Sequence, residues 1–320
     1  MFYTPAELSG LYLRFAEYIR SVPGLRWGVG SLDAAMIPTR GGEIVGIIGR
    51  PGHGKSSMLA YWAKYTAEQL VLEGRAEKEC VVYVTYDQAV EEIETMLEAD
   101  EEASVTDLAS GRVDLEQVRT RVLRRINLPV WVMGKAVLER RTAPRMTISN
   151  VYEGLRAMET EYGVHPALII LDYIQVVPIE GRMDRNAQVT EAVVSAKELT
   201  LEIGSPMAIG VQATRAVDQR EDKIPTIGDC QWSSALEQES AKLLGILRPS
   251  LAYKDWEGRK IRYRGQEVPI TPTTFLVRLE KQRFGPSGQL FMLDFSPQFV
   301  RLADLELGAQ PASEDWVKNV

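Results

Sequence analysis

One glycine-rich segment combines residue types that together bind phosphate. Residues 49–56 read Gly-Arg-Pro-Gly-His-Gly-Lys-Ser and fit the pattern G-x-x-x-x-G-K-[ST]. Glycines let backbone N–H groups converge on phosphate oxygens, a lysine adds a point charge, and a serine hydroxyl can bind Mg²⁺. The residues predicted to contact ATP are Gly49, Gly52, His53, Gly54, Lys55, Ser56 and Ser57. Lys55 is also expected to stabilise the transferring phosphoryl group, whereas no catalytic role is expected for His53.

A buried acid is the expected partner of this loop in holding Mg²⁺. Residues 167–172 read Ala-Leu-Ile-Ile-Leu-Asp, an apolar run typical of a parallel strand that is buried on both faces. Its last residue, Asp172, would lie at the carboxyl edge of the sheet, where nucleotide sites form. Asp172 and the Ser56 hydroxyl are therefore predicted to hold Mg²⁺, the carboxylate acting through water.

Hydrolysis also needs a group that orients or deprotonates the attacking water. Asp87 follows the β-branched run at 80–85 and is the best-placed carboxylate, because that strand is expected beside the phosphate-loop strand. The alternative is that Asp87 belongs to an acidic surface, since residues 87–116 contain eleven acids and one base.

Segments typical of strands and helices alternate along the chain and would position these side chains. Strands are expected at 43–48, 80–85, 129–133, 168–171, 207–211, 242–248, 275–280 and 289–295. Helices are expected at 5–20, 54–74, 88–99, 113–126, 149–162 and 189–203. The alternation predicts an α/β fold with a mainly parallel central sheet flanked by helices.

The composition limits the class of protein. The chain has 320 residues, a net charge of −7 and the apolar and charged content of a soluble globular protein. No uncharged apolar run reaches the length of a membrane span, so no membrane partner is expected. Two cysteines and two histidines exclude a disulfide framework and a zinc pattern, and a cytoplasmic location is expected. Because the acids concentrate at 87–116, the net charge does not exclude a nucleic-acid partner elsewhere.

Taken together, these motifs resemble the RecA-like ATPase domain of DnaB-type hexameric replicative helicases. The resemblance runs from about residue 24 to 295. Three further segments carry it in the family's order: Leu-Asp-Tyr-Ile-Gln at 171–175, Val-Gln-Ala-Thr-Arg-Ala-Val-Asp-Gln-Arg at 211–220, and Lys-Gln-Arg-Phe-Gly-Pro-Ser-Gly at 281–288. It implies a RecA-like P-loop NTPase that hydrolyses ATP with Mg²⁺.

The resemblance also implies roles for individual residues. Gln212 would sense the γ-phosphate, and Arg283 with Lys281 would reach across a subunit boundary as an arginine finger. Two loops, 178–188 and 214–226, would face the channel of a ring and bind single-stranded DNA. Their predicted DNA-binding cations are Arg182, Arg185, Arg215, Arg220 and Lys223. The implied partners are single-stranded DNA, further copies of the chain in a homo-oligomeric ring such as the family's hexamer, and a loader or other replication partner.

The chain departs from the family pattern in two places that bear on function. Asp87 stands where the family has glutamate, and its side chain is one methylene shorter, which predicts either slow hydrolysis or a shifted strand end. The family's amino-terminal helical domain is expected to be missing. Residues 1–23 would form a linker-like helix, 24–300 the ATPase domain and 301–320 an acidic tail. Two packing partners are open for the helix at 5–20, a neighbouring subunit or its own domain.

Two functions of different classes follow. The leading hypothesis is a ring-forming, ATP-dependent motor on single-stranded DNA, a DnaB-like helicase. The alternative is an ATP-driven assembly switch that recruits a partner with little unwinding, which Asp87, the expected lack of the amino-terminal domain and the mixed charge of the two loops favour. A RecA-type strand-exchange filament fits the motifs less well. DNA binding is expected to be weak and salt-sensitive unless the basic segment 245–290 takes part, where a structural or nucleic-acid-binding hairpin is expected at 253–272.

Overall fold

A mixed β-sheet forms the centre of the molecule. The computed structural model describes residues 2–139, 146–179, 183–230 and 234–306, and within them one nine-stranded sheet has the order β11-β10-β9-β6-β1-β5-β4-β2-β3. Its strands are β1 (Ile44–Gly49), β2 (Glu79–Thr85), β3 (Val130–Met133), β4 (His165–Asp172), β5 (Met207–Gln212), β6 (Lys242–Leu247), β9 (Thr274–Gln282), β10 (Leu290–Ser296) and β11 (Arg301–Asp304). The strands from β6 to β3 run parallel, and β9, β10 and β11 add an antiparallel flank.

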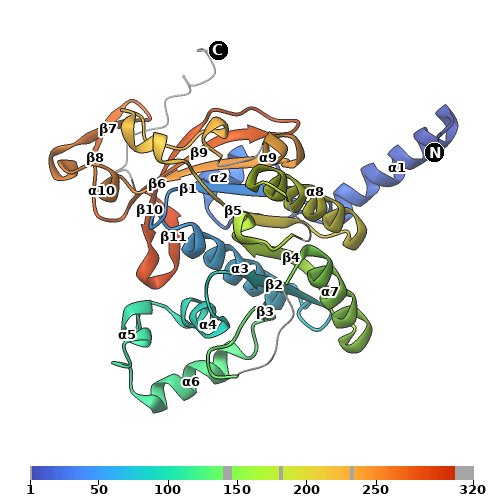
Figure 1. Cartoon of the computed structure of the whole chain (residues 1–320), viewed down its shortest axis with the longest axis horizontal. Coiled ribbons are helices and arrows are strands. Elements are labelled where there is room, and N and C mark those ends of the chain that lie inside the picture. Colours follow the sequence, from blue (N-terminus) through green and yellow to red (C-terminus); the bar gives the residue numbers. More distant parts are fainter. Residues whose placement is uncertain (1, 140–145, 180–182, 231–233, 307–320) are drawn as a thin grey trace.

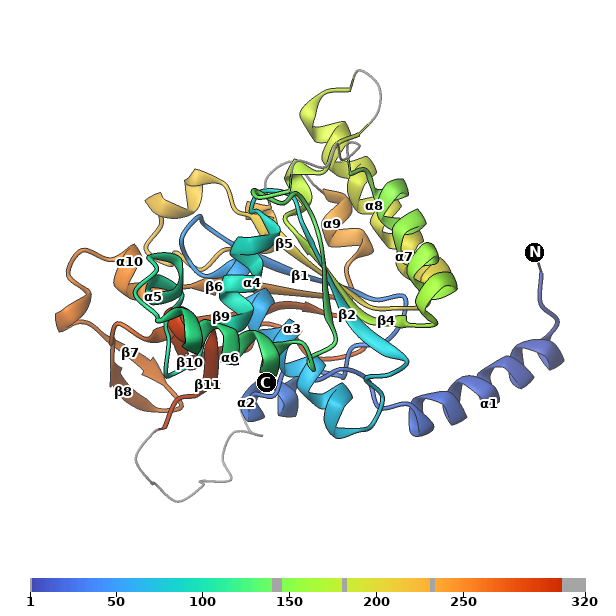
Figure 2. The same ribbon diagram turned by 90° about the horizontal axis from the view of Figure 1, so that it is seen from below.

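Helices cover both faces of this sheet (Figures 1 and 2). The α-helices of the described residues are α1 (Pro5–Ser21), α2 (Gly30–Ala35), α3 (Lys55–Leu72), α4 (Val90–Glu98), α5 (Val105–Ala109), α6 (Leu115–Arg125), α7 (Ile148–Tyr162), α8 (Arg185–Ile203), α9 (Ser234–Glu239) and α10 (Pro249–Ala252). The apolar residues of α2, α3 and α4 pack on one face, and those of α7, α8 and α9 pack on the other. The predicted α/β fold with a mainly parallel sheet flanked by helices is confirmed.

The strand β1 illustrates how the sequence encodes this arrangement. All six of its residues are buried. Val45 and Ile47 join the core that contains α3, whereas Ile44 and Ile48 join the core that contains α8. A strand with helices on both faces must be apolar at successive positions, so it reads as an unbroken apolar run.

The position of β2 differs from the sequence-based expectation. β2 was expected beside the phosphate-loop strand β1, and this expectation is wrong. β2 pairs with β4, so that Thr85 lies opposite Asp172, and β5 and β4 separate β2 from β1. Strand order depends on long-range packing, which the local pattern of apolar residues does not encode.

The sheet also continues past residue 300, where an acidic tail was expected to begin. β11 pairs with β10, with Leu302 opposite Phe295, and Leu302 is buried. The carboxylate of Asp304 accepts a hydrogen bond from the backbone N–H of Ser31 at 3.1 Å. Residues 301–304 are therefore part of the sheet.

The helix α1 projects away from the sheet and its covering helices (Figures 1 and 2). Thr4 caps it in a capping box with Glu7, and Pro5 occupies its first turn. None of its residues is buried, and the apolar side chains of Leu8 and Phe15 are 59% and 55% exposed. Within the described residues, α1 thus leaves its apolar side chains uncovered.

The acidic segment 87–116 and the helix that follows it form a lobe of α4, α5 and α6 (Figure 1). Arg121, itself buried, donates to both carboxylate oxygens of Asp100 at 2.7 and 2.8 Å. Arg125, also buried, donates to Glu94 at 3.1 Å. Part of the acidic charge is therefore balanced by arginines that follow it in the sequence.

The hairpin expected within residues 253–272 is present and consists of β7 (Lys260–Tyr263) and β8 (Gln266–Pro269). Its turn places Arg264 at φ 50° and Gly265 at φ 78°, the left-handed pair of a tight hairpin turn. Tyr263 and Val268 pack into a small core with Ile224.

In the part of the chain that the structure describes, no helix has both the length and the apolar character needed to cross a bilayer.

Candidate nucleotide site and nucleic-acid loops

The glycine-rich segment has the backbone that its motif predicts. It leaves β1 at Gly49 and enters α3 at Lys55. Gly52 and Gly54 have left-handed backbones, with φ of 80° and 93°. At Gly54 a Cβ atom would also lie 2.5 Å from the ring of Phe295. Glycine is therefore required at Gly54 for two reasons, and the strand–loop–helix context of a phosphate loop is present.

Lys55 lies at the start of α3 with its ammonium group over the loop. Its Nζ donates to the carbonyl oxygens of Gly49 at 3.0 Å and Arg50 at 3.1 Å. Burial lowers the pKa of Lys55 to about 8, and the charge of Arg50 acts in the same direction while Asp172 opposes it. Lys55 therefore remains largely cationic at neutral pH and can pair with a phosphate.

His53 anchors the loop to the neighbouring strand. Its side chain is buried, and Nδ1 accepts a hydrogen bond from the backbone N–H of Arg248, directly after β6, at 3.1 Å. Burial, together with the charges of Lys55 and Arg248, lowers the pKa of His53 to about 4. The ring is neutral at physiological pH, as an acceptor must be. The sequence predicted a position for His53 in the loop but not this anchor.

Asp172 and Ser56, the two predicted Mg²⁺ ligands, lie together. Asp172 ends β4, is 4% exposed, and accepts hydrogen bonds from the Ser56 side chain and from Tyr83 Oη, the latter at 2.9 Å. Burial raises the pKa of Asp172, whereas these two hydrogen bonds and the charge of Lys55 lower it. A buried carboxylate beside a hydroxyl is an oxygen donor set that suits Mg²⁺. The contact that Tyr83 of β2 makes with Asp172 was not predicted from the sequence.

Asp87 lies two residues after β2, exposed and close to Asp172. The backbone N–H of Tyr86 donates to the carbonyl oxygen of Asp172 at 3.0 Å, which holds the two strand ends together. The negative charge of Asp87 raises the pKa values of both Asp172 and Tyr173. Asp87 is thus within electrostatic reach of the predicted metal site, without a direct contact to it among the described residues.

Gln212 ends β5 directly opposite Gly49 of the phosphate-loop strand. Its backbone exchanges two hydrogen bonds with the buried side chain of Gln175: Gln212 N donates to Oε1, and Nε2 donates to the Gln212 carbonyl oxygen, each at 3.2 Å. Gln175 belongs to the predicted segment 171–175, but no role was predicted for it from the sequence. A cavity of about 510 Å³ adjoins this pair, lined by Arg50, Tyr173, Gln175, Arg185, Gln212, Thr214 and Arg215.

Lys281 and Arg283 lie at the amino-terminal ends of the parallel strands, away from the carboxyl ends where the phosphate loop lies. The antiparallel β9 ends where the parallel strands begin, since Gln282 pairs with Lys242 and the backbone N–H of Arg283 donates to the Ala241 carbonyl oxygen at 2.8 Å. Lys281 Nζ donates to the carbonyl oxygen of Glu237. The structure therefore does not bring these two cations to the phosphate loop of their own chain.

The cations of the first predicted DNA loop are partly described. Arg182 lies outside the described residues. Arg185, at the start of α8, donates to the carbonyl oxygen of Gln175 and to Gln188 Oε1, the latter at 3.2 Å. Arg185 thus lines the cavity beside Gln212.

The cations of the second loop divide into two kinds. Arg215 is exposed at the start of the 3₁₀ helix η2 (Arg215–Gln219) and lines the same cavity. Arg220 pairs with Asp229 at 2.6 Å, and Lys223 Nζ donates to the carbonyl oxygen of Ala252 at 3.0 Å. Arg220 and Lys223 are therefore engaged in holding the loop itself.

Comparisons with known proteins agree with this geometry. The sequence profile of the DnaB-like helicase C-terminal domain matches residues 24–304. The replicative DNA helicase DnaB of Geobacillus stearothermophilus is 23% identical over 287 residues, covering 89% of this chain and 57% of that protein. DnaB of Mycoplasma pneumoniae is 26% identical over 297 residues, covering 88% of this chain and 58% of that protein. The chain thus spans little more than half the length of these relatives.

Two solved structures show the same fold. The solved structure of an ATPase domain superimposes with a TM-score of 0.75 at 18% identity, covering 95% of this chain and 100% of that one. A DnaB-like replicative helicase, solved for its interactions with primase, superimposes with a TM-score of 0.72 at 19% identity, covering 96% of this chain and 68% of that one. The predicted RecA-like fold is confirmed, and the chain belongs to the family of the DnaB-like helicase C-terminal domain.

Proposed function

We propose that this chain is an ATP-hydrolysing motor that acts on single-stranded DNA as a homo-oligomeric ring, as the motor domain of a DnaB-like replicative helicase. One observation carries the proposal: the phosphate loop, the Ser56–Asp172 pair and Gln212 converge at one edge of the sheet. Membership of the helicase family supports the same activity. The proposal includes a cytoplasmic location and a loader or other replication protein as partner.

Each residue at this edge has a distinct task in the proposed reaction. The backbone N–H groups of 49–56 bind the phosphates of ATP, and Lys55 pairs with the β and γ phosphates. Ser56 and Asp172 would hold Mg²⁺, which when bound neutralises charge on the phosphates. Asp87 orients the attacking water, and Gln212 contacts the γ-phosphate.

A ring is proposed because the remaining cations lie away from the site. Arg283 and Lys281 lie at the end of the sheet where the parallel strands begin, whereas Gly49 lies where they end. These two cations can therefore serve a phosphate loop only across a subunit boundary. A cation placed in this way stabilises the transferring phosphoryl group. The uncovered apolar side chains of α1 supply a second contact, because an amphipathic helix gains free energy by packing on a neighbour.

Single-stranded DNA would run along the loops that follow β4 and β5. Arg185 and Arg215 line a cavity at the same edge as Gln212, where they can pair with backbone phosphates without reading sequence. Arg182, Arg220 and Lys223 complete the proposed set. Because Arg220 and Lys223 also hold the loop, binding should be weak and sensitive to salt.

A second function has one observation in its favour. With Arg220 and Lys223 engaged internally, few cations remain for DNA, which suits an assembly switch that binds ATP and recruits a partner. The two functions differ in whether DNA accelerates ATP turnover.

The test is the rate of ATP hydrolysis with and without oligo-dT. The motor predicts strong stimulation, and Lys55→Ala, the control for contaminating ATPases, should show no activity. Tight ATP binding with no stimulation would establish the switch instead. A dilution series adds a test of the ring, since turnover per chain should fall as the assembly dissociates to monomers.

A further inference from the structure

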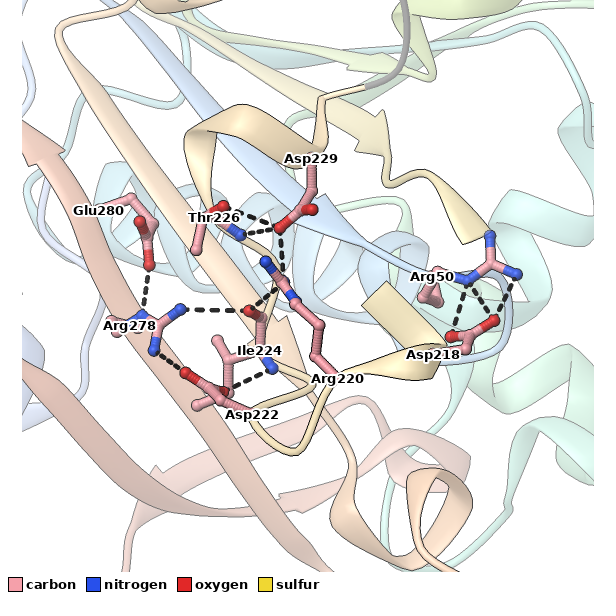
Figure 3. Close-up of polar contacts among 9 residues, drawn as sticks. All are labelled: Arg50, Asp218, Arg220, Asp222, Ile224, Thr226, Asp229, Arg278 and Glu280. Carbon is pink, nitrogen blue, oxygen red and sulfur yellow. Dashed lines mark hydrogen bonds and ion pairs between the residues drawn. The ribbon is translucent and has the colours of Figure 1, made fainter. Parts of the chain in front are cut away.

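The phosphate loop carries an arginine that reaches into the second nucleic-acid loop (Figure 3). Arg50 Nε donates to Asp218 Oδ1 at 3.1 Å and to Oδ2 at 3.2 Å, and Nη2 lies 3.1 Å from Oδ2. The guanidinium also donates through Nη1 to the carbonyl oxygen of Ala213 at 3.1 Å. One side chain of the phosphate loop therefore holds both η2 and the residue that follows Gln212.

The far end of this loop is braced against the sheet (Figure 3). The Arg220–Asp229 pair closes the turn, and Asp229 also accepts from Thr226 N at 2.7 Å. Asp222 pairs at 2.6 Å with Arg278 of β9, and Arg278 also donates to the carbonyl oxygen of Ile224 at 3.1 Å. The braces begin at Arg220, so the short helix η2 lies between them and the end of β5.

Two charged residues of η2, Arg215 and Asp218, are each connected to Arg50. Arg215 and Asp218 are three residues apart, a spacing that aligns side chains on one side of a 3₁₀ helix. Arg215 lines the cavity that Arg50 also lines, and Asp218 pairs with Arg50. A backbone phosphate of single-stranded DNA that binds Arg215 would therefore act on the same short helix that holds Arg50.

The pair is electrostatically close to the phosphate-binding residues. The charge of Arg50 adds to the lowering of the pKa of Lys55 that burial causes, and the charge of Asp218 opposes part of the lowering of the pKa of His53 that burial causes. Asp218 is 48% exposed, so the pair contributes little to stability. Its bidentate geometry instead fixes the position of the loop arginine relative to η2.

We infer that Asp218 is a positioning residue that, through Arg50, couples single-stranded DNA bound at Arg215 to nucleotide bound at the phosphate loop. This inference rests on the proposed function and adds the contact by which the two ligands influence each other. Because such a coupling is reciprocal, nucleotide should change the affinity for DNA by the same factor as DNA changes the affinity for nucleotide.

The test measures this factor in Asp218→Asn. The affinity for fluorescent oligo-dT is titrated with and without a non-hydrolysable ATP analogue, and the affinity for the analogue is titrated with and without oligo-dT. In the unmodified chain the two ratios should agree and reach about fivefold or more. In Asp218→Asn both ratios should fall to near one, while each ligand alone binds within about twofold of the unmodified chain, the effect expected for a weak exposed pair.

Two variants make the result specific. Glu221→Gln removes one negative charge from the same loop at an exposed side chain and should keep the full coupling. Asp218→Glu keeps the charge and should restore much of the coupling. Retained coupling in Asp218→Asn, or equal loss in Glu221→Gln, would overturn the inference. An unmodified chain that binds neither ATP nor DNA would contradict the proposed function itself, so the two failures are distinguishable.

Discussion

Tyr83 Oη donates a 2.9 Å hydrogen bond to Asp172 Oδ2, linking two neighbouring strands at the predicted metal site. Tyr83 is fully buried, so this hydroxyl has a fixed position. Donation to the ionised carboxylate lowers the pKa of Asp172 and offsets part of the increase that burial causes. The bond therefore favours the ionised form of Asp172, which the proposed Mg²⁺ site requires.

Replacing this donor should weaken the metal site. In Tyr83→Phe, the pKa of Asp172 should rise and the Mg²⁺ concentration for half-maximal ATP turnover should increase about tenfold, the equivalent of a charge-assisted hydrogen bond. Turnover at saturating Mg²⁺ should change little. Tyr61→Phe is the control, since Tyr61 packs on the same face of the sheet away from Asp172. An unchanged Mg²⁺ requirement in Tyr83→Phe would contradict the role of this bond.

Asp87 should limit the rate of hydrolysis. Asp87→Asn removes the charge that is proposed to orient water and should lower kcat by about 10²-fold or more. Asp87→Glu extends the carboxylate by one methylene and should raise kcat, by up to about 10²-fold if the present position is short of the optimum. Single-turnover kinetics would measure both effects. If Asp87→Glu is no faster than the unmodified chain, slow hydrolysis does not arise from the length of this side chain.

Arg283 should act on the nucleotide of a neighbouring chain. Arg283→Ala should retain ATP binding and lose about 10³-fold in turnover. Mixing Arg283→Ala with Lys55→Ala should restore measurable activity, because some boundaries then join an intact Lys55 to an intact Arg283. If Arg283 instead served its own chain, every site in the mixture would be defective and no activity would return.

His53 should make stability depend on pH. Its folded-state pKa, about 4, is below the usual 6.5, so its contribution is fully present above pH 6.5 and is lost as pH falls toward 4. The loss should be on the order of 3 kcal/mol in the free energy of unfolding. Urea titrations between pH 7 and 4 would measure it. His53→Ala should remove this part of the pH dependence, whereas His165→Asn should keep it.

The exposed helix α1 should support assembly and contribute little to folding. Leu11 and Phe15 are 38% and 55% exposed and lie one turn apart on the helix. Changing both to serine should alter the free energy of unfolding by less than about 0.5 kcal/mol per site, the usual range for exposed positions. The assembly should dissociate at higher protein concentration than normal, as measured by analytical ultracentrifugation. Glu17→Ser on the same helix is the control, and equal dissociation in that variant would contradict a role for the apolar side chains.

The sequence by itself determined the features that depend on local chemistry. The glycine–lysine–serine segment from Gly49 to Ser56 predicted its own strand, loop and helix, because backbone freedom and charge are properties of those residues. Asp172 was predicted as the end of a buried strand for the same reason. The family motifs extended this prediction to the fold, which the structure confirms.

Only the tertiary structure decided which of these residues touch. β2 lies beside β4, which brings Tyr83 to Asp172 across a separation of 89 residues. Arg50 meets Asp218 across 168 residues, and the side chain of His53 meets the backbone of Arg248 across 195. Such contacts depend on strand order and on how the strand ends align at one edge of the sheet. Both are set by the packing of the whole core, which no local pattern of residues specifies.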